Sequence, residues 1–251
     1  MKKLGLIGFP LGHSFSKKFY EEKFEQEQIT GFHYDLYPIE DIAAFPSIFE
    51  QEPTFSGFNV TLPHKRNVMR FLNEFSPEAA EINAVNCIQI TWQNGRPYLK
   101  GFNTDAFGFE QSLRPLLKPY HTQALVLGNG GAAQAVYYIL RKLGIPYKIV
   151  SRNRNNGDLT YSDLTEEIIA SHKLLINCSP VGTFPNVEEA PDIPYEGIGT
   201  AHLLYDLVYN PEETTFLKKG KARGADIKNG YEMLILQAKK NWEIWNQETS
   251  N

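Results

Sequence analysis

The sequence contains little cysteine: among its 251 residues only Cys87 and Cys178 carry a thiol. Each lies within an apolar run that is typical of a strand, so we expect two buried, unpaired cysteines in a reducing compartment and therefore a cytoplasmic protein. Metal-ligand spacings such as HExxH or paired CxxC do not occur, and the six histidines are scattered. A metal site is therefore not expected.

Long apolar runs are absent as well, and none approaches the roughly eighteen residues of a membrane-spanning helix. The first residues indicate a strand rather than a secretion signal. The formal net charge of −4 gives no reason to expect nucleic acid or an anionic membrane surface as a partner. The apolar content of 42% predicts a globular protein with one large or two small domains.

Short apolar runs alternate with amphipathic segments along the chain, which is typical of a mostly parallel α/β fold. Between two of these runs, the pair Asn94-Gly95 predicts a hairpin turn. The expected strands cover residues 4–8, 32–37, 55–61, 85–91, 96–102, 124–128, 146–151, 174–178 and 203–208. The expected helices cover residues 16–28, 105–116, 130–143 and 230–245, one that opens at Pro63 and one that contains Gly220.

The alternation restarts after "KPYHT", residues 118–122, so we expect two α/β domains. The first is expected to comprise residues 1–104 and to be completed by the C-terminal helix, residues 231–251. The second is expected to comprise residues 105–230 and to be of the Rossmann type, because a nucleotide-binding pattern opens it.

That pattern is the stretch "ALVLGNGGAAQAVYYIL", which places the turn Gly128-Asn129-Gly130-Gly131 between a strand and a helix. Glycines let the backbone approach a pyrophosphate, and the free N–H groups of the helix start bind its charge. Many strand–helix turns need glycine for backbone reasons alone, so the turn by itself is weak evidence. A second strand about twenty residues later strengthens the prediction of a dinucleotide site.

The end of that second strand carries Ser151, Arg152 and Arg154, where an NAD site usually offers an acidic residue to the ribose. A guanidinium in this place suits the 2′-phosphate of NADP. A solvated basic loop would have the same sequence, and this alternative stays open. Together, the glycine turn and the arginines favour NADP as the cofactor.

In the first half of the chain, polar residues follow the expected strands, at the edge where open α/β sheets bind ligands. Each has an ordinary alternative: Ser14 and Ser16 suit a helix cap, Ser16 above all, Asp105 suits an N-cap, and Lys65 suits a solvated surface. The candidates are Ser14, Ser16, Asn59, Thr61, Lys65, Asn86, Asn103 and Asp105.

Lys65 and His64 fall in the first turn of the helix that we expect to open at Pro63. The helix dipole disfavours a positive charge there by about 0.3–1 kcal/mol. We therefore expect a lysine whose charged form is slightly destabilised, which favours donation of its proton. We expect only local hydrogen bonding from His64.

Taken together, these stretches resemble one family. The motifs "GHSFS", "GFNVTLPHK", "AVNCI", "GFNTDAFG", "GNGGAA", "YDLVYNP" and "NGYEMLILQA" occur in the order and spacing of shikimate dehydrogenases, from about Lys3 to Trp245. The resemblance implies a shikimate-binding first domain and an NADP-binding second domain, in a monomer or homodimer. It also implies reversible, NADPH-dependent reduction of 3-dehydroshikimate to shikimate, within chorismate and aromatic amino acid biosynthesis.

The resemblance also implies a role for each matching residue. Lys65 would give a proton to the carbonyl oxygen as hydride reaches its carbon, and Asp105 would orient the neighbouring hydroxyl and the lysine. Ser14 and Ser16 would bind the substrate carboxylate. The other implied substrate contacts are Thr61, Asn86, Tyr209 and Gln237. The implied cofactor contacts are Gly128, Asn129, Gly130, Gly131, Ala132, Ser151, Arg152 and Gly230.

The sequence departs from the family pattern most clearly at "SRNRN", which lacks the usual threonine, so that Arg152 matches a family arginine and Arg154 is only a candidate. Lys17 replaces a proline, and Cys87 a threonine. Two alternatives stay open: an NAD-dependent quinate/shikimate dehydrogenase, and a non-catalytic protein that binds NADP or shikimate as a regulator. Arg152 argues against the first, and the presence of both Lys65 and Asp105 against the second.

Overall fold

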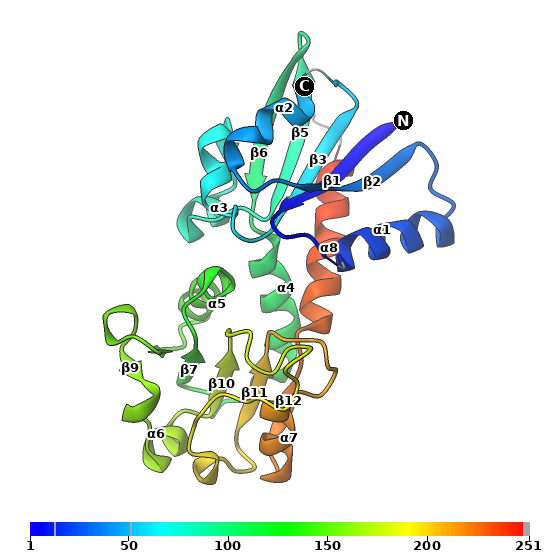
Figure 1. The fold of residues 1–251 in the computed structure, drawn as a ribbon. Helices are drawn as coiled ribbons and strands as arrows, with labels where there is room; N and C mark the ends of the chain where they lie inside the picture. The colour runs from blue at the N-terminus through cyan, green and yellow to red at the C-terminus, as the bar shows by residue number, and fades with distance from the viewer. Residues whose placement is uncertain (13, 51, 248–251) are drawn as a thin grey trace. The chain divides into compact units, whose positions relative to one another are not determined.

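The computed structural model describes residues 1–12, 14–50 and 52–247. The chain divides into two compact units, Met1–Thr104 with Gln237–Asn251 and Asp105–Leu236 (Figure 1). Each unit contains a six-stranded sheet, and helices accompany the strands of both (Figure 1). The predicted class, α/β with a mostly parallel first domain and a Rossmann-type second domain, is confirmed.

The sheet of the first unit has the strand order β2-β1-β3-β5-β6-β4. Strand β1 pairs in parallel with β2 and β3, and β5 is antiparallel to both β3 and β6. The predicted hairpin between β5 and β6 is confirmed, with left-handed backbone at Asn94 and Gly95. The strands are β1 (Lys2–Gly8), β2 (Phe32–Pro38), β3 (Phe55–Val60), β4 (Glu74–Phe75), β5 (Cys87–Gln93) and β6 (Arg96–Phe102).

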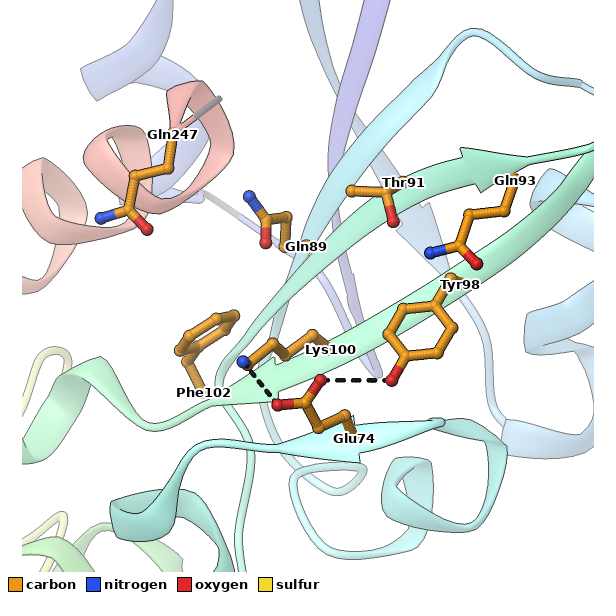
Figure 2. A pocket seen from close by; sticks show the side chains of 8 residues that line it. All are labelled: Glu74, Gln89, Thr91, Gln93, Tyr98, Lys100, Phe102 and Gln247. Carbon is orange, nitrogen blue, oxygen red and sulfur yellow. Dashed lines mark hydrogen bonds and ion pairs between the residues drawn. The ribbon is translucent and has the colours of Figure 1, made fainter. Parts of the chain in front are cut away.

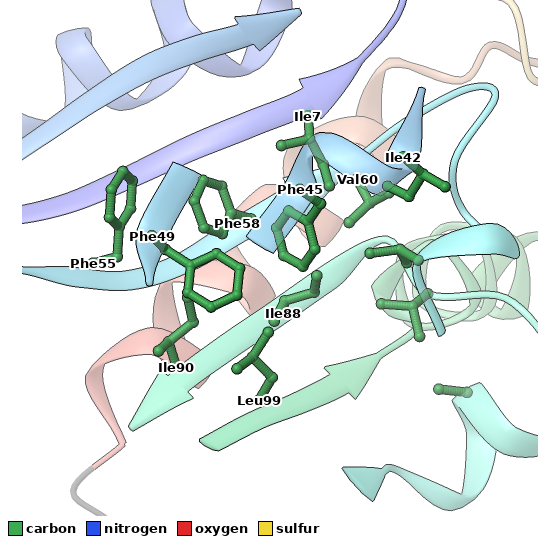
Figure 3. Close-up of a cluster of buried hydrophobic side chains, with 13 residues drawn as sticks. Ile7, Ile42, Phe45, Phe49, Phe55, Phe58, Val60, Ile88, Ile90 and Leu99 are labelled. Atoms are coloured by element: carbon green, nitrogen blue, oxygen red, sulfur yellow. The ribbon is translucent and has the colours of Figure 1, made fainter. Parts of the chain in front are cut away.

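Alternate residues of these strands face two separate apolar layers, as the two-residue period of a strand requires. Leu4 and Leu6 of β1 belong to a layer that contains residues of α1 and α8, whereas Ile7 belongs to the opposite layer. Figure 3 shows that layer, with aromatic rings from α2 and β3 above the aliphatic side chains of β5 and β6. The helical segments are α1 (Phe15–Gln26), η1 (Ile42–Ala44), α2 (Phe45–Phe49), η2 (Asn67–Phe71) and α3 (Pro77–Ile82), where η denotes a 3₁₀ helix.

Two helices contain the borders between the units: α4 (Thr104–Leu113) and α8 (Tyr231–Asn246). In α8, Trp245 packs so closely on β3 that a Cβ at Gly57 would lie 2.2 Å from its indole nitrogen Nε1. The same nitrogen donates a hydrogen bond to the Ile88 carbonyl at 2.9 Å. The last turns of α8 are therefore a fixed part of the first unit.

The second unit has an all-parallel sheet with the order β12-β11-β10-β7-β8-β9. Its central strands are buried at every position and are mostly apolar, as expected where both faces of a sheet are covered. The strands are β7 (Ala124–Leu127), β8 (Tyr147–Ser151), β9 (Leu159–Thr160), β10 (Leu174–Asn177), β11 (Leu203–Asp206) and β12 (Asp226–Lys228). The helical segments are η3 (Arg114–Leu116), α5 (Gly131–Lys142), η4 (Arg154–Asn156), η5 (Tyr161–Asp163), α6 (Glu166–Ser171), η6 (Tyr195–Gly197) and α7 (Thr215–Ala222).

Strand order reverses at β7, because the chain passes from β7 to β8 on one side and later returns to β10 on the other. The crevice outside the carboxyl ends of the strands at such a point is where open α/β sheets bind ligands. In this unit the crevice is bordered by the residues that follow β7 and β10.

Two local predictions are wrong. No α-helix opens at Pro63: the residues after β3 form turns, and the next helical segment is η2. The Lys65 carbonyl accepts from Val85 N at 2.8 Å, so it is not available for a helical bond. At α1, Ser14 rather than Ser16 is the N-cap, and its hydroxyl accepts from Lys17 N.

Candidate functional site

The loops that follow β1 and β3 are joined to each other. Phe9 N donates to the Leu62 carbonyl at 3.0 Å, and Thr61 N donates to the Ile7 carbonyl at 2.9 Å. The methyl group of Thr61 occupies the space of a side chain at Gly8, where a Cβ would lie 2.4 Å away. The loop that carries Thr61 and Lys65 is thereby fixed against the loop that leads to Ser14.

Lys65 is half-buried in a turn, and its main chain is held by the bond from Val85 N. Because no helix begins at Pro63, Lys65 does not lie in the first turn of a helix, and the predicted helix dipole is absent there. Its neighbour His64 is 2% exposed, and its Nε2 lies 2.6 Å from the Ile39 carbonyl oxygen. A carbonyl only accepts, so Nε2 carries the hydrogen, and His64 ties the Lys65 turn to the end of β2.

A buried polar chain begins at Tyr34. Its phenol donates to Asn59 Oδ1 at 2.8 Å. Burial raises the pKa of that phenol well above its ordinary value, although the nearby Ser16 hydroxyl acts to lower the pKa. The phenol therefore stays a donor. Asn59 Nδ2 in turn lies 3.4 Å from the Asn86 carbonyl. The chain links one predicted substrate residue to the neighbourhood of another.

Asn86 is the centre of a second polar cluster in the first unit. Its Oδ1 accepts from Thr104 N at 2.7 Å, and its Nδ2 donates to Thr104 Oγ1 at 3.0 Å. Thr104 Oγ1 donates to Asn241 Oδ1 at 2.5 Å. Gln237 Oε1 accepts from Asn241 Nδ2 at 3.1 Å and lies 3.5 Å from Asn86 Nδ2. The predicted residues Asn86 and Gln237 are therefore brought together, through Thr104 and Asn241.

Sequence reasoning did not find Thr104 or Asn241. A usable signal for Asn241 was its spacing of four from Gln237, which puts two amides on one face of α8. Thr104 directly precedes Asp105, and Asp105 was the residue that we interpreted as a helix cap or substrate contact. In the structure α4 begins at Thr104, so Asp105 lies in its first turn, half-buried, where the helix dipole favours a carboxylate.

In the second unit, a cavity of about 650 Å³ lies at the reversal of strand order. Of the predicted cofactor residues, Gly128, Asn129, Gly130, Ser151 and Arg152 line it. Gly131 and Ala132 are instead the first two residues of α5. The lining residues that sequence reasoning missed are Tyr161, Cys178, Ser179, Pro180, Val181, Glu189, Ala190, Pro191 and Asp192. Cys178 follows β10 directly, so the rule that ligands bind at strand ends could have found its segment.

The backbone of the glycine turn, residues 128–131, is suited to the close approach of a ligand. Gly128 has φ +101°, and a Cβ there would lie 3.1 Å from the main-chain nitrogen of Ser179, which also lines the cavity. Gly130, the N-cap of α5, offers no side chain to the first N–H groups of the helix and has open space around its Cα. These N–H groups are consequently free of a capping side chain, as an anion site at a helix start requires.

Two other predicted positions lie elsewhere in the second unit. Gly230 precedes α8, and a Cβ there would lie 2.1 Å from the Leu207 carbonyl oxygen, so the backbone packing alone requires glycine. Tyr209 follows β11 and is 38% exposed, and partial burial raises the pKa of its phenol. Neither residue lines the 650 Å³ cavity.

The first unit contains a cavity of about 280 Å³ that is lined by residues of β4, β5 and β6 and by Gln247, which follows α8 (Figure 2). Figure 2 shows the Glu74 carboxylate bound to Lys100 Nζ, at 2.6 Å, and to the Tyr98 hydroxyl, at 3.2 Å. The remaining lining groups are mostly neutral amides and a hydroxyl. None of the predicted site residues lines this cavity.

The described part of the chain holds no group of three side chains suited to a metal ion. Within the same residues, no helix is long and apolar enough to cross a membrane.

An all-parallel sheet with a glycine turn, an uncapped helix start and an arginine around one cavity is the architecture of a dinucleotide-binding protein. Comparison with known proteins identifies the family within this class. The family model for the shikimate dehydrogenase substrate binding domain matches residues 6–88. The shikimate dehydrogenase (NADP(+)) of Desulforamulus reducens is 34% identical over 263 residues, covering 96% of this chain and 88% of the relative. That of Bacillus cereus (strain B4264) is 32% identical, covering 100% and 95%.

Comparison with solved structures supports the same family. The shikimate 5-dehydrogenase from Thermus thermophilus, in complex with NADP(H) and shikimate, has a TM-score of 0.83 at 31% identity, with 98% of this chain and 94% of the other covered. The chain belongs to the shikimate dehydrogenase family. The family that the motifs predicted is thereby confirmed.

Proposed function

We propose that the protein is a shikimate dehydrogenase, which reversibly reduces 3-dehydroshikimate to shikimate with NADPH. The observation that carries this proposal is the joined pair of loops after β1 and β3. They fix Thr61 and Lys65 beside the loop that leads to Ser14, in a chain whose relatives are named NADP(+)-dependent shikimate dehydrogenases. The reaction belongs to the synthesis of chorismate and the aromatic amino acids.

The residues of the second unit fit NADP. The cavity accepts a close backbone approach at Gly128, and its wall provides the uncapped start of α5. Arg152 is exposed on the lining, where a guanidinium can bind a phosphate in a bidentate manner. When bound, the cofactor supplies the hydride of the reaction. We assign its binding to Gly128, Asn129, Gly130, Gly131, Ala132, Ser151, Arg152 and Gly230.

On the substrate side, we assign the carboxylate of shikimate to the hydroxyls of Ser14 and Ser16. Neutral hydroxyl donors bind an anion without introducing a second cation beside Lys65. The ring hydroxyls are assigned to Thr61, Asn86 and Gln237, and Tyr209 is assigned to the carboxylate end. The rigid contacts of Asn86 with Thr104 support its role, because an amide held on both atoms presents a fixed hydrogen-bond pattern.

Lys65 is the proposed general acid. Negative charge develops on the carbonyl oxygen when its carbon accepts hydride, and the Lys65 ammonium can stabilise that charge and transfer a proton to the oxygen. Asp105 is the proposed partner that binds the adjacent hydroxyl and orients the lysine. In the reverse direction neutral Lys65 takes the proton back from the hydroxyl.

The test is the absorbance at 340 nm with purified full-length protein, first with shikimate and NADP+, then with NAD+, then with quinate in place of shikimate. We expect turnover of shikimate with NADP+. No absorbance change in any combination would exclude an enzyme and favour the regulator alternative. A preference for NAD+ and quinate would instead support the quinate/shikimate dehydrogenase alternative.

We further propose a cytoplasmic protein of one or two chains. The two thiols support a reducing setting: Cys87 is buried, and neither cysteine is paired. Light scattering during gel filtration would distinguish a monomer of 28.6 kDa from a dimer, and a larger mass would contradict the proposal.

A further inference from the structure

The two arginines after β8 lie in different surroundings. Arg152 lines the 650 Å³ cavity and forms no hydrogen bond or ion pair with another residue that the structure describes. Arg154 is engaged: its Nη2 donates to both carboxylate oxygens of Asp163, at 2.5 and 2.7 Å. One guanidinium is therefore available to a ligand, and the other is held by a carboxylate of the protein itself.

The Asp163 carboxylate is held in place by Thr160, independently of its ion pair with Arg154. Its Oδ2 accepts from Thr160 N at 2.8 Å and from Thr160 Oγ1 at 2.7 Å, in the capping box that starts η5. The bonds from Thr160, together with the charge of Arg154, lower the pKa of Asp163. The carboxylate is ionised at neutral pH and already oriented, so little ordering is needed to bind Arg154.

Both partners belong to segments that border the cavity. Arg154 opens η4, whose last residue, Asn156, accepts a hydrogen bond at its carbonyl from Asn129 Nδ2 at 2.9 Å. Asn129 lines the cavity, and so does Tyr161, the first residue of η5. Arg154 and Asp163 do not line the cavity themselves, but each lies within two residues of a residue that does, Arg152 and Tyr161.

We propose that Asp163 is a specificity-determining residue, which limits the preference for NADP over NAD by holding Arg154 away from the 2′-phosphate. The inference rests on the proposed function, because it takes the cavity to be the dinucleotide site. A 2′-phosphate binds guanidinium groups in the way a carboxylate does, so it competes with Asp163 for Arg154. While Asp163 keeps Arg154, Arg152 alone distinguishes the two cofactors.

The test is a double-mutant cycle with Asp163→Asn and Arg154→Ala, in which NADP+ and NAD+ are titrated into the full-length protein by calorimetry. An amide at position 163 can still accept the Thr160 bonds, so the capping box is retained. An exposed ion pair contributes little, so we expect Asp163→Asn to tighten NADP+ about two- to fivefold and to change NAD+ less. The gain should vanish in the Arg154→Ala background.

A gain of the same size without Arg154 would show a simple loss of negative charge and would overturn the proposal, as would an unchanged affinity for NADP+. The single variant Arg154→Ala gives a second test if Asp163→Asn folds poorly. We expect it to leave the NADP+ affinity within about twofold of wild type, because Asp163 already holds this arginine. A loss of tenfold or more would show that Arg154 binds the phosphate and would also overturn the proposal.

Glu196→Gln is the matched control, because it removes one carboxylate from another exposed arginine pair of the same unit, with Arg223. It should change neither affinity. Failure of the proposed function has a different signature, the absence of shikimate oxidation by the wild type, which the calorimetric titrations do not involve.

Discussion

The carboxylate of Asp206 accepts a hydrogen bond from the Thr214 hydroxyl at 2.6 Å, and both residues are completely buried. Asn177 Nδ2 and Val208 N donate to the other oxygen at 2.9 and 3.0 Å. Asn177 Oδ1 then accepts from the main chain and the hydroxyl of Ser179. A buried acid thus holds the segment that follows β10 and lines the 650 Å³ cavity.

We expect this acid to give the stability a distinct pH dependence. Burial raises the pKa of Asp206 from 3.8 to about 6, although three hydrogen bonds oppose the rise. The folded state therefore binds a proton more readily than the unfolded state, so the contribution of Asp206 to the unfolding free energy grows as the pH falls from about 6 to about 4, by at most about 3 kcal/mol.

The measurement is urea unfolding of wild type and Asp206→Asn across that range. Acids whose pKa is lowered, such as Asp35 and Glu110, have the opposite sign but are common to both proteins. The stability of wild type minus that of the variant should rise as the pH falls. Parallel curves would mean that Asp206 does not titrate in this window.

Much of the fold could be predicted because the responsible signals are local. The run Ala124–Leu127 is apolar at every position, as a strand covered on both faces must be. The pair Asn94-Gly95 needs only its own backbone to form the hairpin turn. Such features require no knowledge of distant partners.

Where a distant residue decides the structure, prediction from the sequence was wrong or incomplete. Pro63 is a residue type that favours a helix start. The Lys65 carbonyl nevertheless accepts a hydrogen bond from Val85 N, and the segment forms turns instead of a helix. Thr104 meets Asn241 across 137 positions, and no local pattern announces that contact. Arg154 pairs with Asp163, a contact that no local sequence pattern indicates. Polar pairing is decided by tertiary contacts, which periodicity does not encode.

Gly220 also shows the difference between a local sequence signal and a tertiary contact, and it yields a second prediction. From the sequence, glycine inside α7 only weakens the helix, by about 1 kcal/mol relative to alanine. In the structure a Cβ at this position would lie 2.3 Å from Leu204 Cδ2, and Leu204 is fully buried. We expect Gly220→Ala to destabilise the protein despite the gain in helix propensity, because overpacking costs about 1–3 kcal/mol.

Chemical denaturation of a double mutant would check the cause. When Leu204→Ala removes the atoms that collide, Gly220→Ala should become neutral or stabilising. Gly199→Ala serves as the control, since a Cβ there has nothing within 4 Å. If Gly220→Ala stabilises the wild-type background, close packing against Leu204 is not the reason for the glycine.

Lys65→Ala tests the proposed chemistry. Loss of the proposed general acid should lower kcat by about 10²–10⁴-fold. The KM for shikimate should change little, because the variant retains the proposed substrate contacts Ser14, Ser16 and Asn86. Steady-state kinetics in the direction of shikimate oxidation give both constants. Lys148→Ala, at an exposed lysine of β8, should match wild type. Near-normal turnover by Lys65→Ala would remove this residue from the mechanism.

Asn241 tests whether the buried amide cluster serves binding as well as folding. Asn241 is completely buried, and its replacement by leucine removes the acceptor of the Thr104 hydroxyl and the donor to Gln237. Loss of these two buried hydrogen bonds should cost about 1–3 kcal/mol of stability. Because Asn241 fixes which way the Gln237 amide faces, Asn241→Leu should also raise the KM for shikimate more than it lowers kcat. Asn246→Leu, at an exposed position of the same helix, should leave both unchanged. A destabilised variant with an unaltered KM would show that Asn241 contributes to folding and not to binding.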